Sequence, residues 1–189
     1  MKEIFRKRME KNPVICAVKD INNIDEAISS DSEIIFCLCG NIFNLPDVVN
    51  TVKSKGKLIF LHIDLIEGFS KDVTALKYIN ERIKPDGIIS TKNNLLKVAK
   101  DLGLLTVQRL FIIDSLSIET TVKTSSTINP DAIEIMPGIM PRIIAELSNT
   151  LSVPIIAGGL ISEKEDIIKA TESGALGVST SSKNLWRKN

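Results

Sequence analysis

Eight short apolar runs, rich in valine and isoleucine, recur along the chain, and each is followed by a polar turn and a segment with helical spacing. Each run is continuous rather than alternating, which is typical of strands buried on both faces of a parallel sheet. The sequence therefore predicts a strand–helix unit that is repeated eight times. The expected strands lie at residues 14–18, 34–38, 58–63, 87–89, 105–113, 132–136, 154–157 and 175–178.

Helix start and stop signals agree with this reading of the chain. Ser162 and Glu165 have the spacing of a capping box, and Gly174 fits the position just after the helix that they would open. Pro46 and Pro141 fit the first turn of two further helices, where a missing N–H costs nothing. We therefore expect helices between the apolar runs.

Eight regular units without a break favour a closed barrel, and a weak internal repeat (85–90 and 130–135) supports it. Typical barrels have about 250 residues, so a chain of 189 would form a minimal one. An open doubly wound sheet is the alternative, although no glycine-rich dinucleotide fingerprint follows the first run. We predict an α/β fold, a minimal (β/α)8 TIM-type barrel with an all-parallel sheet. It would be one domain over 1–189 with a basic N-terminal segment at 1–12.

Composition and charge exclude several classes of protein. Apolar residues make up 43% and charged residues 25% of the chain, which argues against a disordered, collagen-like or coiled-coil protein. The formal net charge of +1 provides no overall attraction to nucleic acid or membrane, although a basic patch is compatible with it. The N-terminus lacks the apolar run of a secretory signal, and no stretch is as long as a membrane span. We expect a cytoplasmic protein with no membrane contact.

Three cysteines form a sparse set without the spacing of a metal or redox motif. Cys37 and Cys39 are two residues apart within an apolar run, a Cys-x-Cys rather than a Cys-x-x-Cys pattern. Buried free thiols are common small hydrophobes in reducing compartments. We therefore predict no metal site and no cofactor.

The last two units carry the sharpest local signal. In a barrel of this type the working residues lie at the C-terminal ends of the strands, and phosphate binds at the loops after the seventh and eighth. Glycine lets backbone N–H groups approach an anion closely, and hydroxyl groups complete the site. The alternative is that these residues only turn the chain and cap a final helix. The predicted phosphate-binding residues are Gly158, Gly159, Ser179, Thr180 and Ser181.

Polar side chains also end several other predicted strands. His62 and Asp64 are two apart and share a strand face, and Asp20 and Glu134 end other strands. Such a group can bind the hydroxyls of a polyol, or it can bind a metal or move protons. A structural role is the further alternative, with Asp64 capping its loop and His62 in the core. We assign these four residues to the hydroxyl end of a ligand.

Gln108 and Arg109 are adjacent on the fifth run, so only one of them can face the lumen. The sequence alone does not decide between them. An arginine in the lumen would be costly without a carboxylate or phosphate partner. We add Arg109 to the predicted ligand-binding residues.

Seven stretches, in order along nearly the whole chain, resemble one bacterial family, the glycerol-3-phosphate-responsive antiterminators, which regulate glycerol uptake operons. They are PVICAVKD (13–20), LHIDLIEG (61–68), PDGIISTK (85–92), QRLFIIDS (108–115), EIMPG (134–138), AGGLI (157–161) and VSTS (178–181). The resemblance implies a barrel that senses glycerol 3-phosphate, binds leader mRNA and prevents premature transcription termination, without catalysing a reaction. The rival hypothesis is a small barrel enzyme, a lyase, isomerase or transferase acting on a phosphorylated three-carbon or sugar substrate.

The sequence says less about RNA and about self-association. It has no RNA-recognition or KH signature, and a single tryptophan and a single tyrosine offer little for base stacking. A homo-oligomer is left open. We expect the loops after the first three strands to move, with Phe69 exposed unless it covers a ligand or partner. The candidate RNA-binding cations, whose alternative role is a solvated helix face, are Lys2, Arg6, Lys7, Arg8 and Lys11, with Lys183, Arg187 and Lys188 at the other end.

Overall fold

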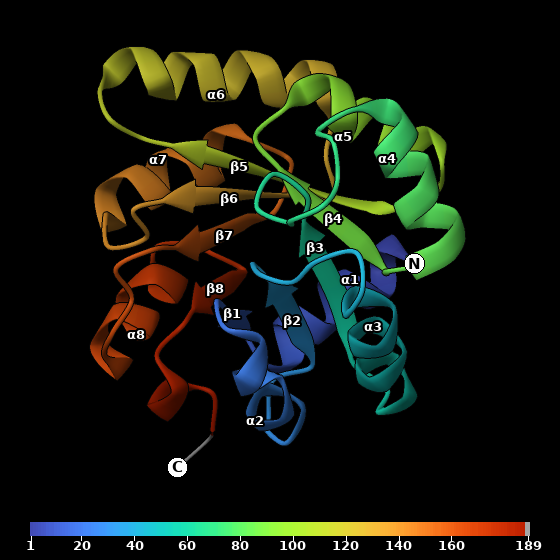
Figure 1. Cartoon of the computed structure of the whole chain (residues 1–189). Helices are drawn as coiled ribbons and strands as arrows, with labels where there is room; N and C mark the ends of the chain where they lie inside the picture. Colours follow the sequence, from blue (N-terminus) through green and yellow to red (C-terminus); the bar gives the residue numbers. More distant parts are fainter. Residues whose placement is uncertain (188–189) are drawn as a thin grey trace.

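The eight apolar runs form eight parallel strands that pair in chain order, and β8 pairs with β1 to close the barrel. The computed structural model describes residues 1–187 (Figure 1). The predicted TIM-type barrel is confirmed, with strand ends that differ by one or two residues from those expected. The strands are β1 (Val14–Val18), β2 (Ile34–Cys37), β3 (Leu58–His62), β4 (Gly87–Ser90), β5 (Leu105–Phe111), β6 (Ala132–Met136), β7 (Ile155–Gly158) and β8 (Gly177–Thr180).

Helices surround the barrel and bury their apolar faces against the strands. One helix precedes β1, and the others connect successive strands. They are α1 (Lys2–Lys11), α2 (Ile24–Ile28), α3 (Leu45–Ser54), α4 (Val73–Tyr78), α5 (Asn93–Asp101), α6 (Ser115–Ile128), α7 (Pro141–Thr150) and α8 (Lys164–Glu172). A π-helical turn (Ile79–Ile83) continues α4, and short 3-10 turns lie at Ile21–Asn23 and Lys183–Leu185.

The helix ends follow the expected capping chemistry with one shift. Pro46 and Pro141 lie in the first turns of α3 and α7, as predicted. The capping box of α8 begins one residue later than expected, because Asp166 accepts hydrogen bonds from the backbone N–H groups of Ser162 and Glu163. These two bonds hold the pKa of the Asp166 carboxyl below its usual value.

The N-terminal segment is a helix that closes the bottom of the barrel. Phe5 and Met9 of α1 are four residues apart, lie on one face and are buried in the lumen with the aromatic rings of Phe36 and Phe60. The ring centroids of Phe5 and Phe60 are 4.7 Å apart. The segment expected to present basic residues therefore also supplies part of the core.

The internal repeat has a structural role at the same end of the barrel. The carboxylate of Asp86 accepts a hydrogen bond from the N–H of Ile59, and that of Asp131 accepts bonds from the N–H and hydroxyl of Thr106. Each aspartate thus satisfies a backbone donor near the start of the preceding strand. The Pro-Asp turns stabilise the end of the barrel opposite the C-terminal ends of the strands.

Replacing Phe5 with alanine tests whether α1 packs into the bottom of the barrel. We expect the free energy of unfolding to fall by about 3–5 kcal/mol, because a large buried ring is replaced by a cavity. Urea unfolding followed by circular dichroism measures the change. The matched control is Ile4→Ala, since Ile4 lies on the same helix and is 51% exposed. Equal losses from the two variants would show that Phe5 is not part of a packed core.

Candidate functional site

A cavity of about 250 Å³ opens at the C-terminal ends of the strands. In Figure 1 the arrowheads of β5, β6 and β7 point toward this end of the barrel. The volume suits a small metabolite rather than a dinucleotide. The cavity is lined by Ala17, Lys19, Leu38, Leu65, Arg109, Glu134, Met136, Gly159, Leu160, Ile161, Ser179, Thr180 and Ser181.

A buried ion pair forms the floor of this cavity. Arg109 of β5 and Glu134 of β6 lie side by side in the strand register, and Arg109 Nε donates to Glu134 Oε2 at 2.7 Å. Ser179 of β8 donates from Oγ to the other carboxylate oxygen, Oε1, at 2.5 Å. Arg109 is 6% exposed and Glu134 is fully buried. Three strands therefore contribute to one network that holds a cation inside the barrel.

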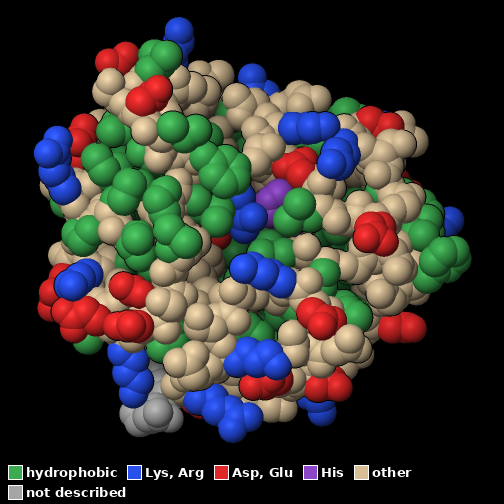
Figure 2. All heavy atoms as spheres, turned by 60° about the vertical axis from the view of Figure 1, so that its left-hand side comes forward, with side chains coloured by type: hydrophobic (Ala, Val, Ile, Leu, Met, Phe, Trp, Pro, Cys, Tyr) green, Lys and Arg blue, Asp and Glu red, His purple; other side chains and the backbone are tan. Residues whose placement is uncertain are grey.

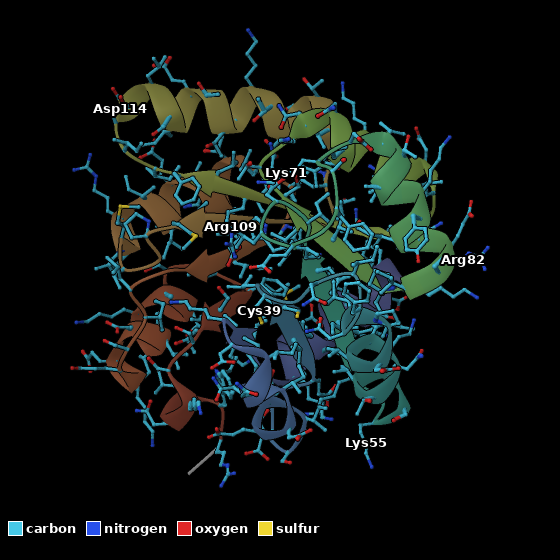
Figure 3. The ribbon with its side chains drawn as sticks, viewed as in Figure 1. Cys39, Lys55, Lys71, Arg82, Arg109 and Asp114 are labelled. Carbon is cyan, nitrogen blue, oxygen red and sulfur yellow. The ribbon has the colours of Figure 1, made fainter. Side chains whose placement is uncertain are left out.

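Of the two adjacent residues Gln108 and Arg109, it is Arg109 that faces the lumen. Arg109 points into the barrel (Figure 3), whereas Gln108 donates from Nε2 to Asn93 of α5 and therefore faces outward. Within residues 1–187, Nε is the Arg109 nitrogen that has a hydrogen-bond acceptor. The remaining N–H groups of the guanidinium therefore offer a planar fork to an anionic ligand, a geometry suited to phosphate.

Gly158 and Gly159 have different roles in the wall of the cavity. A Cβ atom at Gly158 would lie 2.5 Å from Glu134 Oε1 and 2.7 Å from Ser179 Oγ, so this glycine makes room for the buried network. Gly159 has a φ of +77°, a conformation that favours glycine, and lines the cavity directly. Leu160, which also lines the cavity, has a φ of +61°.

The hydroxyl groups after β8 are also unequal. Ser179 donates to Glu134, and Thr180 donates to the carbonyl oxygen of Ile161 at 2.7 Å. The hydroxyl of Ser181 has no hydrogen-bond partner in the described part of the chain. The structure thus gathers four of the five predicted phosphate-binding residues at one cavity, with Ser181 the one whose hydroxyl is free for a ligand.

Three of the residues assigned to the hydroxyl end of a ligand lie outside the cavity wall. Asp20 caps the turn at Ile21–Asn23 by accepting from the N–H of Asn22. Asp64 accepts from the hydroxyl of Ser90 and from both the N–H and the hydroxyl of Thr91. Asp64 therefore has the capping role that was its alternative in the sequence, and Asp20 has a capping role that the sequence analysis did not consider.

His62 is buried and unpartnered at Nδ1, which lies 3.9 Å from Asp64 Oδ2. Burial, with the nearby charge of Arg109, lowers the pKa of His62 to about 4. The imidazole is therefore neutral at pH 7. It is an uncharged side chain, and Figure 2 shows it at the opening of the barrel.

Lys19 was missed as a site residue. It lies directly after β1, lines the cavity, and has no ion pair among the described residues. The sequence does contain a signal for Lys19, because it directly follows the first apolar run, and residues at the C-terminal ends of barrel strands lie at the cavity. With Arg109 it provides a second positive charge at the same cavity.

The predicted N-terminal RNA-binding cations lie at the opposite end of the barrel, because α1 packs there. Each is paired with a carboxylate: Lys2 with Asp131, Arg6 with Glu10, Lys7 with Glu3, and Arg8 and Lys11 with Glu33. At the other end of the chain, Lys183 pairs with Glu26, and Lys188 lies outside the described residues. The five N-terminal cations therefore lie away from the loops that surround the cavity.

Phe69 also differs from expectation. It is partly buried and packs against Tyr78 of α4, with ring centroids 5.7 Å apart. Among residues 1–187, no group of three or more histidine, cysteine or acidic side chains is arranged to hold a metal, and no helix is long and apolar enough to cross a membrane. Cys16, Cys37 and Cys39 are free thiols.

Comparison with known proteins identifies the family. The model of the family described as glycerol-3-phosphate responsive antiterminator matches residues 14–186. The chain belongs to this family. Its curated relatives include the uncharacterised protein YgcP of Escherichia coli (strain K12), which is 39% identical over 94% of this chain and 93% of its own.

Two solved structures of similar proteins have the same barrel. The glycerol uptake operon antiterminator regulatory protein of Listeria monocytogenes str. 4b F2365 is 35% identical, with a TM-score of 0.88 over 93% of this chain and 95% of its own. A glycerol uptake operon antiterminator-related protein of Thermotoga maritima MSB8 is 28% identical, with a TM-score of 0.81 over 92% and 96%. The antiterminator family thus shares this fold at full length.

Removing the carboxylate of Glu134 tests the buried ion pair. Glu134→Ala leaves Arg109 buried without its counter-ion, a change that typically costs about 3–5 kcal/mol. Urea unfolding should show this loss, and added inorganic phosphate should recover part of it by supplying an anion to Arg109. Ser179→Ala is the control, because it removes a single hydrogen bond and should cost about 1–2 kcal/mol. No recovery with phosphate would contradict an anion site at Arg109.

The lowered pKa of His62 predicts a dependence of stability on pH. The unfolded chain, with a pKa near 6.5, binds a proton more readily than the fold, with a pKa of about 4, so stability should fall as pH is lowered through this window. The difference corresponds to about 3 kcal/mol. Unfolding free energies at pH 7 and pH 4.5 measure it, and His62→Gln should show a correspondingly smaller loss. Identical pH profiles would exclude His62 as the source.

Proposed function

We propose that the chain is a non-enzymatic sensor of glycerol 3-phosphate that binds the leader mRNA of a glycerol-utilisation operon and prevents premature transcription termination. Family membership supports this function. The observation that carries the ligand assignment is Arg109, a buried cation with N–H groups that lack acceptors in residues 1–187 and line a small cavity.

The phosphate group of the ligand would bind to Arg109 and Lys19. The backbone at Gly159 and the hydroxyl of Ser181 would complete its surroundings, since both line the cavity. Charge-assisted hydrogen bonds of this kind are about twice as strong as neutral ones. The phosphate would therefore provide most of the affinity, and unphosphorylated glycerol would bind far more weakly.

The glycerol end would be recognised by Glu134. Each of its carboxylate oxygens already accepts one hydrogen bond, from Arg109 or from Ser179, and each has a further lone pair for a ligand hydroxyl. Asp20, His62 and Asp64 would act behind the wall of the cavity by holding the loops and the lumen in place.

The same network supports binding without turnover. Histidine and the carboxylates are the most frequent general bases in enzymes. The carboxylate of Glu134 is tied to Arg109 and Ser179, and His62, with a pKa of about 4, lies outside the cavity wall. Conversion of glycerol 3-phosphate to another compound during incubation with the protein would favour the rival enzyme hypothesis.

The first test of this function is ligand selectivity. We expect glycerol 3-phosphate to raise the melting temperature and glycerol to have little effect. Calorimetric titration should show about a tenfold weaker Kd for Lys19→Gln, since one charge-assisted bond to the phosphate is lost. Lys183→Gln is the control, because Lys183 lies after β8 but pairs with Glu26. Equal stabilisation by glycerol and its phosphate would overturn the phosphate site.

The RNA surface is more consistent with the ligand-facing end of the barrel than with α1. Lys71 and Lys92, in the loops after β3 and β4, form no ion pairs within residues 1–187, whereas all five N-terminal cations are paired. Lys92 Nζ donates to the carbonyl oxygen of Lys71 at 3.4 Å, so the two loops lie side by side at the C-terminal ends of the strands. RNA bound there would lie beside the ligand, where each can alter the affinity for the other.

Filter binding to leader RNA with ligand present tests this placement. Lys71→Gln combined with Lys92→Gln should weaken binding several-fold and reduce its salt dependence, because two phosphate contacts are lost. Arg6→Gln combined with Lys7→Gln should leave binding unchanged. The reverse pattern would place the RNA on α1, and affinity that does not depend on glycerol 3-phosphate would remove the switch.

A further inference from the structure

Five large hydrophobic side chains are exposed beside the mouth of the cavity. They are Phe111 (54% exposed), Ile113 (86%), Leu116 (66%), Ile139 (44%) and Leu160 (70%), and we call them the rim patch. They lie at the end of β5, in the loops after β5, β6 and β7, and in the first turn of α6. Figure 2 shows hydrophobic side chains gathered on this side of the molecule, next to the opening in which the single histidine is visible.

Backbone hydrogen bonds hold the loops of the rim patch side by side. The N–H of Ile112 donates to the carbonyl oxygen of Met136 at 2.8 Å, which ties the end of β5 to the end of β6. The N–H of Gly138 donates to the carbonyl oxygen of Gly159 at 3.1 Å, which ties the next loop to the one after β7. The patch is therefore a preformed surface rather than a set of separate loops.

The size of the rim patch suits a protein interface. The exposed parts of its five side chains amount to on the order of 500 Å² of apolar surface, at the upper end of what a monomer leaves in one patch. A standard interface buries about 800 Å² on each partner, with an apolar centre and a polar rim. The rim patch is large enough to form that centre.

The charges around the patch indicate the partner. Asp114 and Glu119 lie exposed on the α6 side, and Arg142 lies exposed at the start of α7, without an ion pair to any described residue. A surface with both signs at its edges can complement itself across a two-fold axis, which sets the acidic edge of one copy against the basic edge of the other. RNA would need an excess of positive charge, and four of the five patch residues are aliphatic and do not stack on bases.

We propose that the rim patch is the interface of a homodimer formed by a second copy of this chain. Leu160 belongs to both the patch and the wall of the ligand cavity. A second copy would therefore cover one side of the cavity mouth. The proposal rests on the patch and its charges, and it stands whether or not the ligand is glycerol 3-phosphate.

Sedimentation velocity of the full chain, from about 1 μM to about 100 μM, tests the proposal. We expect the wild type to associate to a dimer and Ile113→Asp to weaken association at least a hundredfold, because each interface would contain two uncompensated charges. Ile168→Asp is the matched control and should dimerise normally, since Ile168 is equally aliphatic and 50% exposed but lies within α8 and is not a patch residue. Circular dichroism and melting curves confirm that both variants fold.

A wild type that stays monomeric over the whole range would overturn the proposal, and so would an Ile113→Asp variant that dimerises like the wild type. Loss of RNA binding by Ile113→Asp in a monomeric wild type would show instead that the patch contacts RNA. Arg142→Glu should weaken dimerisation about tenfold, and combining it with Glu119→Arg should restore it. Failure of that restoration would exclude the two-fold arrangement of charges.

Discussion

The pairing of Arg109 with Glu134 is the constraint on which the ligand end of the barrel depends. A cation buried among strands is tolerated when a carboxylate neutralises it and hydrogen bonds satisfy both groups. This requirement sets which side chains of β5 and β6 face inward, because the two residues must be partners in the strand register. It also requires glycine at 158, since any side chain there would meet Glu134 and Ser179.

The two ends of the barrel therefore serve different purposes. At the bottom, aromatic rings and the α1 plug fill the lumen, and aspartates satisfy strand donors. At the top, side chains fill the lumen only as far as the Arg109–Glu134 ion pair, and a cavity with this charged floor lies above it. The packed core and the cavity thus lie on opposite sides of one polar layer, and loops at the top can vary without weakening the core.

The fold was readable from the sequence because strands buried on both faces appear as continuous apolar runs, and eight of them without a break have few alternatives to a barrel. The positions of Gly159 and Ser181 at the cavity could be predicted, because residues that follow the last two strands lie at that end of a barrel. The roles of Asp64 and Asp20 could not be predicted, because they depend on neighbouring groups. Each caps a turn by accepting a hydrogen bond from a nearby backbone N–H, that of Thr91 or of Asn22. Whether Arg109 or Gln108 faces the lumen could not be predicted, because either alternation of side chains along β5 fits the sequence. The four-residue spacing of Phe5 and Met9 does indicate a buried helix face, but the charged residues around them drew attention away from it.

Closure of the barrel by its first and last strands has a consequence for the chain as it is synthesised. Val14, Ile15 and Cys16 of β1 pair with residues 178–180, which are synthesised long after β1, and the carbonyl oxygen of Trp186 accepts from the N–H of Asp31. Before β8 is synthesised, one edge of β1 has no partner strand. The buried face of α1 also lacks part of the barrel against which it packs. A nascent chain that lacks β8 would leave this edge of β1 open to other chains, so synthesis of β8 is the step that allows the barrel to close.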